Sequence, residues 1–143
     1  MDERQAQIAL RHVVFGWSLV AVFATLGLAL ETMHGFKLQW YLAVANETRR
    51  LLWTLAHAHG VLLGLLNVAY ALSLRHFPFR SRRPGLVSGL LAAGSLCLPS
   101  GFLLGGVMVH GGDPNLFIAL SPLGGVLLIV VLPMIAYGFL RRP

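Results

Sequence analysis

Four long apolar runs constrain this chain more than any other feature of its sequence. They cover residues 13–34, 51–74, 85–109 and 116–140, and Lys, Arg, Asp and Glu enter them only near one end. About 20 apolar residues in helical form span the hydrocarbon core of a bilayer. The runs therefore predict an all-α, polytopic membrane protein in which four transmembrane helices form an up-down bundle. Residues 1–143 are expected to form a single transmembrane domain.

The composition excludes soluble and disordered alternatives. Hydrophobic residues make up 57% of the 143 residues and charged residues 11%, whereas a soluble domain has about 45–50% apolar and about 25% charged residues. Intrinsic disorder would need low hydrophobicity and high net charge. The single cysteine, Cys97, excludes an internal disulfide and a cysteine-based metal centre. The lipid bilayer is therefore the first partner that we expect.

The basic residues fall unevenly on the two sides of the predicted bundle. The side with both termini and the middle connection has Arg4, Arg11, Arg75, Arg80, Arg82, Arg83, Arg141 and Arg142. The other side has Lys37, Arg49 and Arg50. Because Lys and Arg accumulate in cytoplasmic loops, we expect both termini in the cytoplasm, with the protein in a bacterial inner (plasma) membrane. This use of arginine explains the basic charge without a nucleic-acid partner.

Small residues at helical spacing predict where the helices pack. Lipid tails are as apolar as leucine, so transmembrane helices associate where small side chains let their backbones approach. Such pairs are Gly60 and Gly64, Gly85 and Gly89, and Gly101 and Gly105. One face of the second span, with His57, Gly60, Gly64, Asn67 and Ala71, is expected to point into the bundle. These glycine faces exceed the needs of one small bundle, which favours a homo-oligomer or a larger membrane complex.

Five ionisable residues are expected in one layer near the outer surface: Glu31, His34, His57, His59 and His110. Ionisable groups within spans are costly, and they are therefore functional candidates. Glu31 and His34 share a helical face at a spacing that lets both reach one ion. We predict a metal site from Glu31, His34, His57 and His110. His12 and His76 lie beside arginines, where we expect solvated or lipid-facing positions.

His57 and His59 are two residues apart, which rotates them by about 200° around a helix. They cannot both reach one small ion, so His57 is expected to face inward and His59 a neighbouring helix, a partner subunit or a second cofactor. Pairing His57 with His110 across two helices predicts bis-histidine ligation of haem b. Neutral imidazole also suits copper, iron and zinc. The cofactor expected from the residues is therefore haem b or one of these metals.

The segment Ala56-His57-Ala58-His59-Gly60 resembles the His-x-His transmembrane helix of haem–copper-oxidase-type subunit I and related small membrane proteins. In that superfamily, the two histidines of one helix serve different haems. The resemblance thus implies haem ligation by His57 and His59. It extends only over residues 56–64, and the chain has fewer spans than that family and no recognisable copper-ligand set, so oxidase activity is not implied.

Three functions follow from these features. The first is a haem b- or metal-binding membrane protein that transfers electrons or serves as an accessory subunit of a membrane complex. The second is a structural or assembly subunit without a cofactor, in which Glu31 pairs with Lys37 or Arg49. The third is a small proton-coupled transporter with Glu31 and the histidines as a relay. No residue stands out as catalytic, and enzymatic activity stays open.

Local signals also predict the connections between the spans. A short interfacial helix is expected over residues 38–45, followed by Asn46 or Thr48 as the N-cap of the second span. The dipeptide Asp113-Pro114 has the form of an N-cap and a first helical residue, and it predicts the start of the fourth span.

Overall fold

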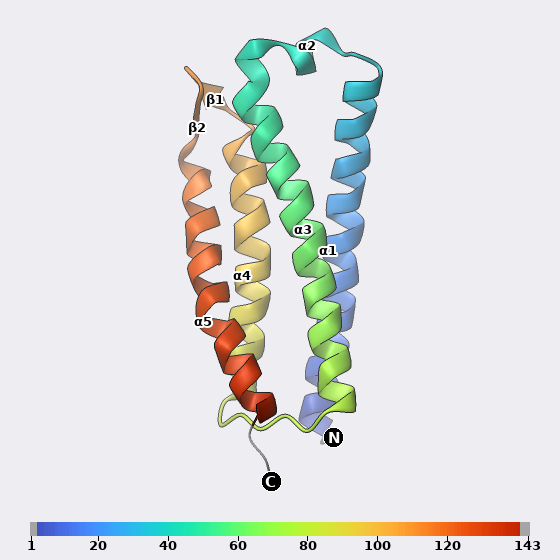
Figure 1. Ribbon diagram of the computed structural model, residues 1–143. Helices are drawn as coiled ribbons and strands as arrows, with labels where there is room; N and C mark the ends of the chain where they lie inside the picture. Colours follow the sequence, from blue (N-terminus) through green and yellow to red (C-terminus); the bar gives the residue numbers. More distant parts are fainter. Residues whose placement is uncertain (1–2, 141–143) are drawn as a thin grey trace.

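Four long helices run up and down in the computed structural model, which describes residues 3–140 (Figure 1). They are α1 (Glu3–Gly35), α3 (Glu47–His76), α4 (Pro84–Gly105) and α5 (Leu120–Leu140). The 3-10 turns η1 (Val44–Asn46) and η2 (Leu116–Ala119) precede α3 and α5. All four helices are long and apolar enough to cross a membrane. The all-α fold and the four candidate spans are thus confirmed.

The two ends of the bundle differ in chemistry. The start of α1, the connection between α3 and α4, and the end of α5 lie at one end (Figure 1). We call it the basic end because Arg4, Arg80, Arg82 and Arg83 lie there; Arg141 and Arg142 fall outside the described residues. The opposite end, which we call the histidine end, holds the short helix α2 (Gln39–Leu42) and the strands β1 (Val109–His110) and β2 (Asp113–Pro114).

The first span is longer than its apolar run, because the helical pattern of buried residues extends toward the N-terminus. Helix α1 begins at Glu3, and Ile8, Ala9 and His12 are already buried in the bundle. At the histidine end, α2 falls within the interfacial helix expected over residues 38–45. Asn46 occupies the predicted N-cap position of α3 without capping it, because its side-chain oxygen accepts a hydrogen bond from Arg49 while its amide nitrogen donates to the carbonyl of Trp40.

The predicted start of the fourth span is wrong. Asp113 and Pro114 form strand β2, which pairs with β1 through a turn where Gly111 and Gly112 have φ of 59° and 91°. Positive φ favours glycine, so this pair of glycines makes the tight hairpin possible. The N-cap is Asn115, whose side-chain oxygen accepts a hydrogen bond from the Phe117 amide at 2.9 Å. Helix α4 accordingly ends at Gly105 rather than at residue 109.

Helices α1 and α3 approach most closely where two glycines meet. A Cβ atom added to Gly64 would lie 2.7 Å from the carbonyl oxygen of Gly16, and one added to Gly16 would lie 2.6 Å from that of Gly64. One helical turn further toward the histidine end, the ring of Phe23 covers Gly60. The expected packing role of Gly60 and Gly64 is therefore confirmed.

Helices α4 and α5 use a second set of glycines. Gly101 faces the backbone of Ser121, and Gly105 faces Ile118, so this predicted pair is confirmed. Gly124 of α5 faces the backbone of Leu98 at 2.5 Å from its added Cβ. By contrast, Gly89 makes no contact within the bundle, because no atom of residues 3–140 lies within 4 Å of a Cβ placed there.

Candidate functional site at the histidine end

A cavity of about 220 Å³ opens between α1 and α3 at the histidine end. Its wall contains three of the residues that the sequence analysis singled out: Glu31, His34 and His57. Gly27, Leu30, Tyr41 and Thr54 complete the lining. The fold therefore gathers a carboxylate, two imidazoles and a phenol around one small space.

His57 is held in one tautomer by the backbone of the neighbouring helix. Its Nδ1 lies 2.7 Å from the carbonyl oxygen of Phe23, and because a carbonyl only accepts, Nδ1 carries the hydrogen. The ring occupies the space left by Gly27, where any added Cβ would overlap the imidazole. Nε2 has no hydrogen-bond partner in residues 3–140 and is not buried. Its lone pair is therefore available to a ligand.

His59 lies on the opposite side of α3. Its Nδ1 donates to the carbonyl of Leu55 in its own helix at 2.8 Å, and its ring lies 5.3 Å from that of Phe102 on α4. His57 faces α1 and His59 faces α4, as the rotation between them predicts. The two imidazoles thus belong to separate surroundings.

His110 does not join His57. It is exposed in strand β1, outside the wall of the cavity, because α4 ends at Gly105 and the chain turns into the β1–β2 hairpin. Within residues 3–140, no three His, Cys, Asp or Glu side chains form a group suited to hold a metal ion. The described residues therefore do not assemble the expected four-residue metal site, and His110 lies outside the cavity that His57 lines.

Two arginines in the first turn of α3 hold the connections at this end in place. Arg50 donates to the carbonyls of Tyr41 and Ala43 at 2.7 and 2.8 Å. Arg49 donates to the carbonyl of Gly106 at 3.0 Å, at the C-terminus of α4, where a positive charge is favourable. Arg49 therefore binds the C-terminus of α4 and does not pair with Glu31. No cation in the described part of the chain forms an ion pair with Glu31.

Tyr41 lines the cavity as a neutral hydroxyl. Burial raises the pKa of the Tyr41 phenol; the positive charge of Arg50 lowers this pKa, and the negative charge of Glu31 raises it. The side chain is 4% exposed. Because the resulting pKa stays above its usual range, the phenol keeps its proton at pH 7.

A second polar group lies inside the bundle nearer the basic end, where the sequence analysis expected His12 to be solvated. That expectation is wrong: His12 is 2% exposed. Its Nδ1 lies 2.7 Å from Oδ1 of Asn67 on α3, and its Nε2 lies 2.8 Å from the hydroxyl of Ser88 on α4. Asn67 in turn donates to the carbonyl of Leu63 and to the hydroxyl of Ser95, both at 2.8 Å.

These bonds fix the orientation of the amide and the imidazole. The amide nitrogen of Asn67 must face the carbonyl of Leu63, which leaves its oxygen toward His12. Nδ1 of His12 therefore carries a hydrogen. The group joins α1, α3 and α4, and we call His12, Asn67, Ser88 and Ser95 the inner polar cluster.

The inward position of His12 was detectable in the sequence. His12, Gly16, Leu19, Phe23 and Gly27 recur every three or four residues and form the face of α1 that packs against α3. The inward orientation of Asn67 is predicted by the small-residue stripe of the second span. The structure confirms this prediction, because the side chain of Asn67 is 0% exposed.

An apolar layer separates the cavity from the inner polar cluster. Leu19 and Phe23 of α1 are buried between the two polar regions, and the ring of Phe23 covers Gly60 of α3. The close contact of Gly16 with Gly64 lies on the same seam. In this conformation the two polar regions are not joined by a polar path along α1 and α3.

No protein-family model, curated protein or solved structure matches the chain. The class that the fold defines is a four-helix protein with candidate membrane spans. The likeness of the His-x-His segment to haem–copper-oxidase-type subunit I rests on those residues alone.

Proposed function

We propose that the protein binds one transition-metal ion, copper, iron or zinc, at the histidine end of the bundle and acts in electron transfer or as an accessory subunit of a membrane complex. The observation that carries the proposal is the setting of His57. Its Nδ1–H is donated to the carbonyl of Phe23, and its Nε2 has no hydrogen-bond partner within residues 3–140. Histidines that ligate metals characteristically donate their other ring N–H to a carbonyl or carboxylate in this way.

Glu31 or His34 is the candidate for one further ligand from the chain. Both line the cavity with His57, and the Glu31 carboxylate has no ion-pair partner within residues 3–140. Because the described residues do not form a three-ligand group, bound water or a partner subunit completes the coordination in this proposal. Copper or iron would supply a one-electron couple, whereas zinc would order the end of the bundle.

The size of the cavity favours an ion over an enclosed haem. Pockets that enclose drug-sized organic ligands have volumes of about 300–1,000 Å³, and this cavity has about 220 Å³. A haem on Nε2 of His57 would place most of its macrocycle against lipid or a partner subunit. The transporter alternative is less favoured, because the apolar side chains of Leu19 and Phe23 interrupt the polar groups along α1.

The proposal predicts metal binding that depends on His57. Protein purified in mild detergent and stripped with a chelator is titrated with Cu²⁺ and, separately, with Zn²⁺, and bound metal is measured by elemental analysis. We expect one ion per chain, loss of this ion in His57→Ala, and about 10- to 100-fold weaker binding in Glu31→Gln, the range found for supporting residues of metal sites. The visible spectrum of the untreated protein is recorded in parallel.

Two histidines serve as matched controls. His76 is exposed at the basic end, where its Nδ1 is hydrogen-bonded to the carbonyl of Leu72 in the same helix. His76→Ala should therefore bind metal like the wild type. His110→Ala should also be unchanged, because His110 lies outside the cavity. A folded protein without bound metal would overturn the proposal in favour of a cofactor-free subunit. A Soret band in the wild type that disappears in His57→Ala would show that the ligand of His57 is haem and not a single metal ion.

A further inference from the structure

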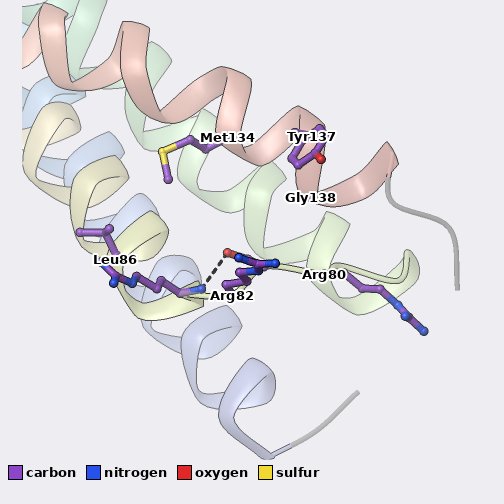
Figure 2. Close-up of a pocket in the computed structure, with 8 residues that line it drawn as sticks. Arg80, Arg82, Leu86, Met134, Tyr137 and Gly138 are labelled. Carbon is purple, nitrogen blue, oxygen red and sulfur yellow. Dashed lines mark hydrogen bonds between the residues drawn. The ribbon is translucent and has the colours of Figure 1, made fainter.

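A cavity of about 490 Å³ lies at the basic end, far from the histidine end. One wall is the connection between α3 and α4, with Arg80, Ser81, Arg82 and Arg83. The other wall comes from the spans: Leu86 of α4 and Met134 and Tyr137 of α5. Figure 2 shows Met134 and Tyr137 on α5 and Leu86 on α4, with Arg80 and Arg82 on the connecting segment below them.

The connection that presents these arginines is tied to the bundle. The amide of Arg80 donates to the carbonyl of Gly138 on α5 at 3.0 Å. The ring of Phe79, which is 5% exposed, packs against the same glycine. The amide of Arg83 donates to the hydroxyl of Ser81 at 3.2 Å. The backbone of the segment is therefore anchored, while the guanidinium groups stay available.

The positive charge of this segment is not neutralised within the described chain. No acidic side chain of residues 3–140 forms an ion pair with Arg80, Arg82 or Arg83. A second cavity, of about 400 Å³, shares Arg80 and Arg82 and adds Arg4 of α1 to its wall. Several arginines thus converge on both sides of one anchored segment, which is an arrangement that attracts phosphate.

We infer that the cavity between this segment and α5 binds the headgroup of an anionic phospholipid. Its polar wall matches a phosphate group, and its apolar wall continues onto the membrane-spanning parts of α4 and α5, where an acyl chain would lie. Leu86 and Tyr137 are 46% and 58% exposed and so can contact such a chain. Basic pockets between transmembrane helices at the cytoplasmic surface bind anionic headgroups by this combination. A free phosphate would use only the polar wall.

Lipid binding to the purified full chain tests this inference. Delipidated protein in neutral detergent is titrated with phosphatidylglycerol and, separately, with phosphatidylcholine, and bound lipid is counted by native mass spectrometry. We expect phosphatidylglycerol to bind at least tenfold more tightly than phosphatidylcholine. Each arginine near an anionic surface contributes about fivefold in affinity. The double variant R82Q/R83Q should therefore bind phosphatidylglycerol roughly 25-fold more weakly than the wild type.

Arg75 provides the matched control, since it is exposed at the same end but lines neither cavity. R75Q should retain wild-type affinity. Inorganic phosphate is the second probe: we expect it to compete poorly, because it lacks the acyl chain. Competition as effective as that of the lipid would overturn the inference in favour of a free phosphate. Equal binding of the two phospholipids, or equal losses in R75Q and R82Q/R83Q, would also overturn it.

Discussion

Replacing Gly64 with alanine is expected to lower the free energy of unfolding by about 2–3 kcal/mol, which is the upper part of the range for overpacked interiors. The added methyl group would lie 2.7 Å from the carbonyl oxygen of Gly16 and 3.0 Å from the amide nitrogen of Val20. Both atoms belong to the backbone of α1, so no side-chain rotation can relieve the overlap. The two helices would have to separate along the seam that also contains the contact of Phe23 with Gly60.

Gly89 offers a matched control within the same kind of helix. No atom of the described chain lies within 4 Å of a Cβ at Gly89. Gly89→Ala should therefore leave the stability unchanged or raise it by up to about 1 kcal/mol, the helix preference of alanine over glycine. Reversible unfolding in mixed micelles with sodium dodecyl sulfate, followed by circular dichroism, measures both variants. Similar stabilities of Gly64→Ala and Gly89→Ala would show that α1 and α3 do not meet at Gly16 and Gly64.

The difference between these two glycines shows which packing contacts can be predicted from the sequence and which cannot. Helical spacing marks both Gly64 and Gly89 as small residues on one face of a span. Which face meets a neighbour depends on the order and rotation of the helices in the bundle, and neither is encoded in the spacing. Four apolar runs of sufficient length, by contrast, determine the class of fold without any knowledge of packing, because the bilayer itself sets the length of a spanning helix.

The candidate site was predictable to a similar degree. Glu31, His34 and His57 were placed at one depth by counting residues along two spans, and they line one cavity. His110 was placed there by extending the third span to residue 109. His110 instead lies in the hairpin whose turn is formed by Gly111 and Gly112. The length of an apolar run does not indicate such a turn.

Loss of Asn67 is expected to have an effect as large as the change at Gly64. In Asn67→Leu, the Nδ1–H of His12 and the hydroxyl of Ser95 lose a partner inside the bundle. A buried polar group left without a hydrogen bond costs about 1–3 kcal/mol. We therefore expect the free energy of unfolding to fall by about 2–4 kcal/mol relative to the wild type, measured by the same unfolding experiment. Ser73→Ala, a change at a partly exposed position outside the inner polar cluster on the same helix, should stay within about 0.5 kcal/mol.

A double-mutant cycle separates the hydrogen bond from the packing of the side chains. His12→Phe alone leaves the Oδ1 of Asn67 without its donor, whereas His12→Phe combined with Asn67→Leu removes both polar partners. If the bond of 2.7 Å is made in the membrane, the double variant should be less destabilised than the sum of the single variants. Such coupling averages about 0.6 kcal/mol between transmembrane helices and reaches about 1.7 kcal/mol. Because both partners of His12 are held by α3 and α4, we expect a value near the upper limit. Strictly additive losses would mean that His12 contributes to the junction of α1, α3 and α4 only by its volume.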